Sequence, residues 1–478
     1  MNELQLLALL PFIVLATASI VVILLIAFRQ SHTVIQVVGF LMMCMVVFAT
    51  WYVKDTLPQA IPPLFVVDGQ GALFTGMIIF SVLAIGLFSY IYFEDREENP
   101  KEYYILLFLG TLGAAILTIS QHFISLFIGL ELLSVSLYAL IAYLRNRNNA
   151  VEAGMKYLVL AALTSAFLLF GMALIYMETG NMEFAVIAKK ITTTSPTLFI
   201  MGLGIMLVAI GFKLALVPFH LWAADVYQGA PSPVTAFIGT VSKIGVFAVL
   251  LRFAQTIQLQ HYPLAISIFS AIAIASMITG NVLALRQQKL KRLLAYSSIA
   301  HFGYLLVAFM PGNSAGTEAA IFYLLAYSIT LLSAFGVIIL LSTGQGDAED
   351  LSLYQGLIWK RPVVATVLSV ALFSLAGIPL TAGFLAKFFV LAAGVQQHMW
   401  LPLIVLVVTS VIGLYYYLRI ISTMFAAPLP TLASPKTLHP FFYISTYAAL
   451  IIMTGLLTWL GVFPGIILQG IKTFLLLH

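Results

Sequence analysis

Charged residues are scarce in this sequence. Only 8% of its 478 residues are Asp, Glu, Lys or Arg, whereas hydrophobic residues make up 62%. An ordinary soluble domain carries about 25% charged residues, so this chain lacks the polar side chains needed to cover a water-facing surface of its size. The net charge of +5 fits loop residues that set membrane topology better than a nucleic-acid surface, and we expect no nucleic-acid partner.

Cysteine is almost absent as well. Cys44 is the only cysteine. A single thiol excludes an internal disulfide, and it excludes an iron–sulfur cluster held by this chain because such a cluster takes about four Cys ligands. The eight histidines are scattered, with no pair at a metal-ligand or haem-ligand spacing. We therefore expect no cofactor, no metal site and no redox centre in this chain.

Long apolar runs are what the sequence has instead. Crossing a hydrocarbon core takes about 20 apolar residues, and runs of that length recur along the whole chain. The sequence therefore predicts an all-α polytopic membrane protein, embedded in a lipid bilayer. Its about fourteen transmembrane helices are expected at residues 5–28, 33–53, 71–92, 103–120, 122–143, 152–177, 195–217, 231–254, 263–285, 291–310, 317–342, 362–394, 400–424 and 443–473.

The loops differ in their positive charge. Fourteen Lys and Arg residues follow odd-numbered spans, and five lie on the opposite face. Positively charged loops favour the cytoplasmic side. We therefore expect a multi-pass protein of the bacterial cytoplasmic (inner) membrane with both termini on the periplasmic side.

Four charged residues lie inside apolar runs: Glu131, Lys213, Lys243 and Lys387. Placing one charge at the bilayer centre costs about 3 kcal/mol on insertion scales, so each position needs a reason. One reason is helix packing through ion pairs. The other is proton transfer, because a lysine away from water releases its proton more readily and a nearby carboxylate helps to retain it. Lysines suit sodium poorly, since hard cations need several oxygen ligands.

Two of the predicted spans, the seventh and the twelfth, carry residues that interrupt helices. Lys213 precedes Pro218 by five residues, and Gly377, Pro379 and Gly383 come just before Lys387. These prolines fit simple packing kinks, or discontinuous helices of an inverted-repeat transporter. On the second interpretation, the chain divides into an N-terminal three-helix segment at 1–102, five-helix repeats at 103–254 (spans 4–8) and 263–424 (spans 9–13), and a C-terminal helix at 443–478.

Four motifs carry a resemblance to a known family. GLELLSVSLYAL, GFKLALVPFHLWAADVYQGAPSPVTAFIGTVSKIGVF, KRLLAYSSIAHFGYLLVAF and SLAGIPLTAGFLAKFFVL resemble the antiporter-like membrane subunits of respiratory complex I, the NADH-quinone oxidoreductase. The resemblance extends over nearly the whole chain. M-type members are expected to have glutamate at the position of Lys387, and L-type members a long lateral C-terminal helix, so neither type fits.

The resemblance implies a role for each buried residue. Glu131 and Lys213 match a Glu–Lys pair that modulates the lysine's proton affinity, and Lys243 matches the central proton-holding lysine. Lys387 matches the residue that connects to the far side or to the next subunit. His301 lies where the family places a polar linker, and Lys156 is expected either on the cytoplasmic input route or as a topology charge. Each repeat would then form a proton half-channel.

The family also implies partners and a driving reaction. The chain would be a proton-translocating subunit with no redox site of its own, coupled to quinone reduction elsewhere in a complex that uses FMN, iron–sulfur clusters and quinone. Its expected partners are the antiporter-like M neighbour, the small subunits K and J, and the peripheral NADH-oxidising arm. A subunit of a multi-subunit sodium/proton antiporter is the alternative, and a scaffold whose charges only pair helices is a third interpretation.

Overall fold

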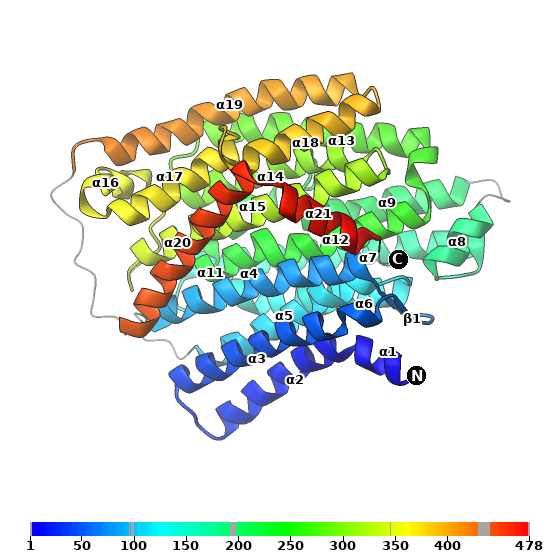
Figure 1. Cartoon of the computed structure of the whole chain (residues 1–478), viewed down its shortest axis with the longest axis horizontal. Helices are drawn as coiled ribbons and strands as arrows, with labels where there is room; N and C mark the ends of the chain where they lie inside the picture. Colours follow the sequence, from blue (N-terminus) through cyan, green and yellow to red (C-terminus); the bar gives the residue numbers. More distant parts are fainter. Residues whose placement is uncertain are drawn as a thin grey trace.

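Long helices packed side by side make up the computed structural model (Figure 1). The structure describes residues 2–94, 96, 100–191, 197–344, 346–428 and 440–476; residues 195–196 of the predicted seventh span and the last two of the C-terminal segment lie outside this part. Within it, 13 helices are long and apolar enough to cross a membrane. The all-α polytopic fold is therefore confirmed.

The spanning helices fall close to the predicted ranges, because each begins and ends where the apolar run does. Their bounds are α2 Leu10–Ala27, α3 His32–Val53, α4 Gly69–Glu94, α5 Lys101–Ile119, α6 Phe123–Ile141, α7 Asn148–Thr179, α9 Thr197–Leu214, the continuous run of α11 Ser232–Phe237, η2 Ile238–Ser242 and α12 Lys243–Thr256, then α13 Pro263–Leu285, α14 Leu290–Phe309, α15 Ser314–Leu341, α19 Trp400–Phe425 and α20 Pro440–Val462.

Short elements connect these helices. They are α1 Glu3–Ala8, α8 Phe184–Ile191, α16 Leu357–Lys360, the 3-10 turns η1 Lys54–Thr56, η3 Leu259–His261 and η4 Leu351–Tyr354, and the strands β1 Gln59–Ile61 and β2 Phe65–Val67. The two strands pair antiparallel, with Ala60 opposite Val66.

Both predicted discontinuous helices are present. The twelfth span consists of two halves, α17 (Pro362–Ala376) and α18 (Ala382–Gln396), and its backbone turns through positive φ at Gly377 and Leu380. The seventh consists of α9 and α10 (Trp222–Gly229), with positive φ at Ala215 in the break. Together with the 13 long helices, the two halves of the twelfth span give the predicted about fourteen spans.

The C-terminal segment differs from the single helix predicted for it. It forms α20 and a second helix, α21 (Gly465–Leu475), with Pro464 between them. Proline has no backbone N–H to continue an α-helix, so the chain changes direction here (Figure 1). The hydrophobicity of 443–473 concealed this break because both helices are apolar.

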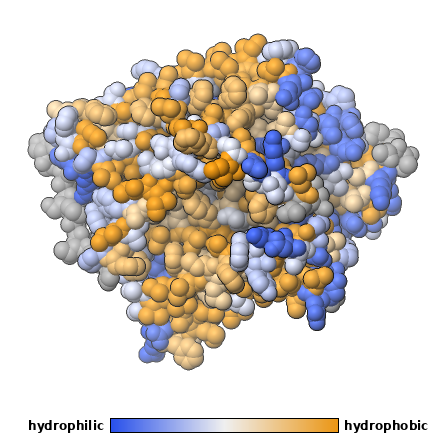
Figure 2. Space-filling view, viewed as in Figure 1, coloured by the Kyte–Doolittle hydropathy of each residue, from blue (hydrophilic) through white to orange (hydrophobic). Residues whose placement is uncertain are grey.

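Burial separates central helices from peripheral ones. In the α11–η2–α12 run, every residue of the most apolar stretch is buried, and 89% is buried in α14 and in α15, against 33% in α2, α3 and α7. Hydrophobic side chains cover most of the middle of the face shown in Figure 2. A lipid-embedded surface of this kind leaves the centre of the bundle as the place where charged side chains are shielded from hydrocarbon.

Ion pairs at one end of the bundle join the loops that follow even-numbered spans. Arg252, at the end of α12, contacts both carboxylate oxygens of Asp68, at 2.6 and 2.8 Å, and donates to the Thr118 carbonyl at the end of α5. Basic loop residues that follow odd-numbered spans meet separately at Asp347. This grouping is what the predicted alternation of loops between the two faces requires.

Candidate functional site

Lys243 lies at the centre of the most buried helices. Only 1% of the residue is exposed, and it begins α12 directly after the π-helical turn η2. Such turns are frequent at functional sites, because they rotate the residues that follow them. Its Nζ donates a hydrogen bond to Ser298 Oγ on α14, at 2.6 Å, and lies 4.3 Å from the centre of the Phe302 ring.

Hydroxyl groups and one imidazole lie beyond this contact in two hydrogen-bonded groups, and the Tyr327 and His301 rings that face each other between them have centroids 5.6 Å apart. Tyr327 OH donates to Ser298 Oγ at 2.7 Å. His301, one turn further along α14, lies with Nδ1 2.7 Å from Tyr323 OH and Nε2 3.3 Å from Tyr417 OH. Groups that both donate and accept hydrogen bonds can pass a proton along such a line.

Lys387 lies at the break between α17 and α18. Its Nζ donates to the carbonyl oxygens of Leu375 and Ala376, both at 3.0 Å. Carbonyls at the end of a helix have no partner within the helix and carry partial negative charge. The break therefore supplies partial negative charge to this buried ammonium group through neutral backbone carbonyls.

A small cavity lies between His301 and the break. It measures about 10 Å³ and is lined by His301, Tyr323, Ala326, Tyr327, Thr330, Ser374, Leu375, Gly383 and Ala386. This is close to the volume that one water molecule needs. The cavity therefore brings the hydroxyl line of α14 and α15 close to the helix half that holds Lys387.

Gly377 is needed at this break for two reasons. Its φ is +81°, and a Cβ atom there would lie 2.9 Å from Lys387 Cδ. A left-handed alanine also costs about 1–2 kcal/mol, so we expect Gly377→Ala to displace the Lys387 side chain. On the role that the resemblance to complex I subunits implies, the variant is expected to lower proton translocation more than NADH oxidation. Dye-detected acidification of membrane vesicles measures the effect. Gly204→Ala is the matched control, because a Cβ there meets no atom within 4 Å; equal pumping by both variants would contradict the role of Gly377.

Glu131 and Lys213 lie near the same turn of α6 without forming an ion pair in the described part of the chain. Lys213 Nζ donates to Ser134 Oγ at 2.7 Å and to Tyr157 OH at 3.2 Å. Glu131, one turn before Ser134, accepts from Ser165 Oγ at 2.5 Å. Each residue of the implied Glu–Lys pair is thus hydrogen-bonded to hydroxyl groups and not to the other residue.

Glu131 is also more exposed than the lysines. It is half-buried, on the stripe of α6 that carries Ile124, Ile128 and Val135, which are 45%, 51% and 58% exposed. A carboxylate among apolar residues on the lipid-facing side of the helix bundle is unfavourable unless the surface of another protein covers it.

Lys156 lies away from the buried lysines. Its side chain is 45% exposed and pairs with Glu152 at 2.7 Å and with Asp225 at 3.0 Å. Asp225 on α10 also contacts Arg292 at 2.7 Å. Lys156 therefore helps to hold the second half of the broken seventh span, and no hydrogen bond or ion pair of the described residues joins it to Lys213 or Lys243.

Several residues that contact the buried lysines or His301 had little signal in the sequence. Tyr323 and Tyr327 on α15, Tyr417 on α19, and Tyr157 on α7 resemble ordinary aromatic residues of apolar helices. A spacing of four residues places Tyr323 and Tyr327 on one helix face, and this was the one pattern that indicated them. Ser134 gave no comparable indication.

Two further observations concern other kinds of site. The described residues include no group of three or more His, Cys, Asp or Glu that could hold a metal ion. A larger cavity of about 730 Å³, near the Asp68–Arg252 pair, opens between the start of α4, the end of α12 and α21. None of the predicted site residues lines it.

Comparisons with known proteins show the family of the chain. A family model described as "NADH:quinone oxidoreductase/Mrp antiporter, TM" matches residues 120–413. Among curated proteins, NADH-quinone oxidoreductase subunit N of Ectopseudomonas mendocina is 45% identical over 88% of this chain and 87% of that protein. Subunit N of Chromohalobacter salexigens is 42% identical over 98% of each.

Solved structures agree as well. A chain of respiratory complex I from Thermus thermophilus, solved with bound aureothin, superposes with a TM-score of 0.83 at 32% identity, covering 96% of this chain and 99% of the other. Matches of this identity and extent, over the helices that carry Lys213, Lys243 and Lys387, establish that the chain belongs to the NADH-quinone oxidoreductase subunit N family, among the antiporter-like membrane subunits of complex I.

Proposed function

We propose that this membrane subunit of NADH-quinone oxidoreductase translocates protons across the bacterial inner membrane along its buried line of lysine, histidine and hydroxyl groups. Quinone reduction elsewhere in the complex supplies the energy. The observation that carries the proposal is Lys243, which is 1% exposed and hydrogen-bonded into the hydroxyl line through Ser298. A buried ammonium group with a neutral hydroxyl partner can lose and regain a proton without breaking an ion pair.

The chemistry of the line favours H⁺ over Na⁺. The groups around the three lysines are hydroxyls, aromatic rings and two backbone carbonyls. A sodium ion needs several oxygen ligands at once, and an ammonium group repels it. A proton needs only a donor and an acceptor at hydrogen-bond distance.

Each residue has a distinct part in this proposal. Lys213, next to Glu131, exchanges protons with Lys243, whose protonation is the central event. His301 and its tyrosines link Lys243 to Lys387, which releases the proton to the far side or to the next subunit. Lys156, on α7, acts at the cytoplasmic entrance through its ion pair with Asp225 on α10, and each repeat, 103–254 and 263–424, forms one half-channel.

The partners follow from the exposed apolar surface. As a complex I subunit, the chain assembles with other subunits of that complex. The stripe of α6 that carries Glu131 is proposed to contact one of the predicted membrane partners, which are the antiporter-like subunit M and the small subunits K and J. The peripheral NADH-oxidising arm holds FMN and iron–sulfur clusters, and this chain holds no cofactor. Both termini are proposed to lie on the periplasmic side.

Purification through a tag on this chain tests the proposal. After mild detergent extraction, a native gel stained for NADH dehydrogenase activity is expected to show a high-mass active band with flavin and iron–sulfur absorbance. The same complex in liposomes is expected to move protons equally well without sodium. An inactive band of membrane subunits alone, with sodium-dependent proton exchange, would instead establish the antiporter alternative, to which the matching family model also extends.

A further inference from the structure

Asp347 is a buried carboxylate that the proposed proton path does not use. Its side chain is 4% exposed, in the loop between α15 and η4. Five groups from four other segments converge on it. They are Tyr92 OH at 2.7 Å, Arg96 at 3.2 Å, Arg147 at 3.5 Å, Ser232 Oγ at 2.7 Å and Lys291 Nζ at 2.8 Å.

The two oxygens of this carboxylate have different partners. Oδ1 contacts Tyr92, Arg96 and Arg147, from the end of α4 and the loop before α7. Oδ2 accepts hydrogen bonds from Ser232 and Lys291. Because Ser232 begins α11 and Lys291 lies at the start of α14, Oδ2 joins these two helices directly.

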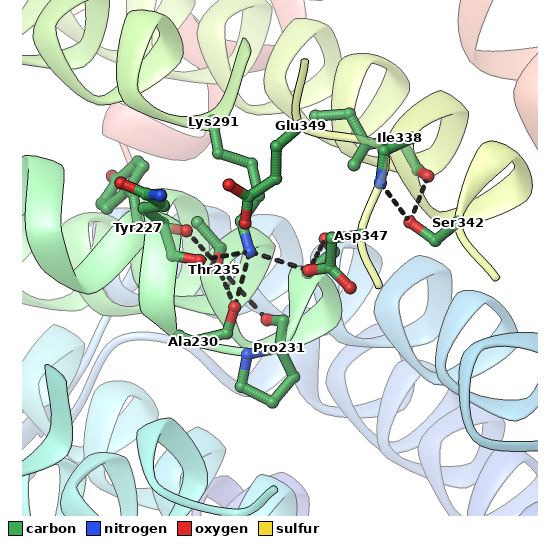
Figure 3. A network of polar contacts seen from close by, with 12 residues as sticks. Tyr227, Ala230, Pro231, Thr235, Lys291, Ile338, Ser342, Asp347 and Glu349 are labelled. Atoms are coloured by element: carbon green, nitrogen blue, oxygen red, sulfur yellow. Dashed lines mark hydrogen bonds and ion pairs between the residues drawn. The ribbon is translucent and has the colours of Figure 1, made fainter. Parts of the chain in front are cut away.

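Lys291 makes this junction tighter. Its side chain is fully buried, and Nζ also donates to the carbonyls of Gln228 at 3.0 Å and Ala230 at 2.6 Å. These carbonyls end α10, the second half of the broken seventh span, where the partial charge is negative. Figure 3 shows Lys291 between Ala230 and Asp347, with Thr235 donating to the same turn of backbone.

The two helices joined by Asp347 meet again at the proposed centre. Lys243 lies in the helical run that Ser232 begins, and Ser298 lies on α14 seven residues after Lys291. Seven residues are about two turns, or about 10.5 Å, so Lys291 and Ser298 share one face of α14. A shift of either helix at Asp347 therefore moves Lys243 relative to Ser298.

We propose that Asp347 is a positioning residue for proton transfer: it fixes α14 against the α11–η2–α12 run so that Lys243 Nζ reaches Ser298 Oγ. The inference rests on the proposed function of Lys243. Removing the anion would leave Lys291 buried beside the carbonyls without its counter-charge, and a buried charge that loses its partner displaces its surroundings.

The junction is expected to be independent of pH in the working range. Burial raises the pKa of Asp347, but Lys291 and Arg96 outweigh burial and hold the pKa well below its usual range. A depressed pKa means that the stabilisation is present above the carboxyl's pKa in the unfolded chain and is lost only as the pH falls through the folded pKa. We therefore expect the Asp347 carboxylate to be charged at neutral pH.

Asp347→Asn in the assembled complex tests the inference, with Asp350→Asn, an exposed acid of the same loop, as the matched control. We expect Asp347→Asn to reduce the protons moved per NADH oxidised by about twofold or more, Asp347→Glu to restore part of the loss, and Asp350→Asn to change nothing. The structure of the Asp347→Asn complex is expected to show the Lys243–Ser298 contact lengthened or broken, which a general loss of stability would not produce.

A second variant is needed for the case in which the Asp347→Asn complex does not assemble. If Asp347→Asn fails to assemble, Ser232→Ala removes one hydrogen bond from the same oxygen and is expected to lower the proton yield to a smaller extent. A wild-type proton yield in an assembled Asp347→Asn or Ser232→Ala complex, or an unchanged Lys243–Ser298 contact, would overturn the inference. If the Lys243→Ala complex also kept the wild-type proton yield, the proposed function itself would fail. If the yield fell in Lys243→Ala but not in Asp347→Asn, only the role of Asp347 would be removed.

Discussion

Replacing Lys243 by alanine is expected to remove most proton translocation while the complex still assembles. The substitution deletes the ammonium group that donates to Ser298, in the α11–η2–α12 run, whose most apolar stretch is fully buried. The proposed cycle links the charge states along the membrane arm, so interrupting it at the central lysine should affect transfer on both sides. Membrane vesicles fed with NADH, with a pH-sensitive dye and a parallel assay of NADH oxidation with an artificial acceptor, measure the result.

Two controls separate proton release from other effects of this change. Lys243→Arg keeps a positive charge, but the guanidinium group does not release its proton in proteins. We therefore expect the Lys243→Arg complex to translocate protons as poorly as the Lys243→Ala complex. Lys101→Ala removes a lysine at the start of α5, outside the buried line, and is expected to pump normally. Full pumping by an assembled Lys243→Arg complex would show that charge alone, and not proton exchange, is needed at this position.

Glu131→Gln is expected to have the second largest effect. The glutamine carbonyl can still accept the hydrogen bond from Ser165 that the carboxylate accepts at 2.5 Å, so the variant removes mainly the charge near Lys213. Without that charge, Lys213 loses the group that stabilises its protonated form. We expect a clear fall in the protons moved per NADH oxidised, measured in the same vesicles.

Glu131→Asp distinguishes charge from geometry at this position. It keeps the carboxylate but shortens its reach, and we expect a milder defect than that of glutamine. Equal damage from both variants would mean that the position of the group matters more than its charge. Glu178→Gln, near the end of α7, serves as the control for removing an acid elsewhere and is expected to leave the proton yield unchanged.

The sequence predicted the architecture well because hydrophobic length and helix breakers are strong local signals. Apolar runs located the spans, and the proline and glycine residues near Lys213 and Lys387 located both broken helices. The same reasoning missed the break at Pro464, since an apolar segment on each side of a proline reads as one run. Lysines inside apolar runs are also conspicuous in the sequence, because the free energy of placing a charged side chain in the bilayer is high.

The contacts between helices were not predictable in this way. Tyrosine is common in membrane helices, so Tyr323 and Tyr327 became recognisable only when α15 was placed beside α14 and Lys243. Lys291 reads as a topology charge in the sequence, yet its side chain is fully buried against Asp347. The hydroxyl partners of Glu131 and Lys213, on α6 and α7, were likewise not predictable from the sequence.

The number of protons moved per NADH oxidised tests the role of the buried line most directly. It would be measured with purified wild-type and Lys243→Ala complexes in sodium-free liposomes, at matched rates of NADH oxidation. If protons pass through Lys243, the ratio falls steeply in the variant, and adding sodium does not change the wild-type ratio. An unchanged ratio in an assembled Lys243→Ala complex, or a wild-type ratio that depends on sodium, would contradict proton translocation through this lysine.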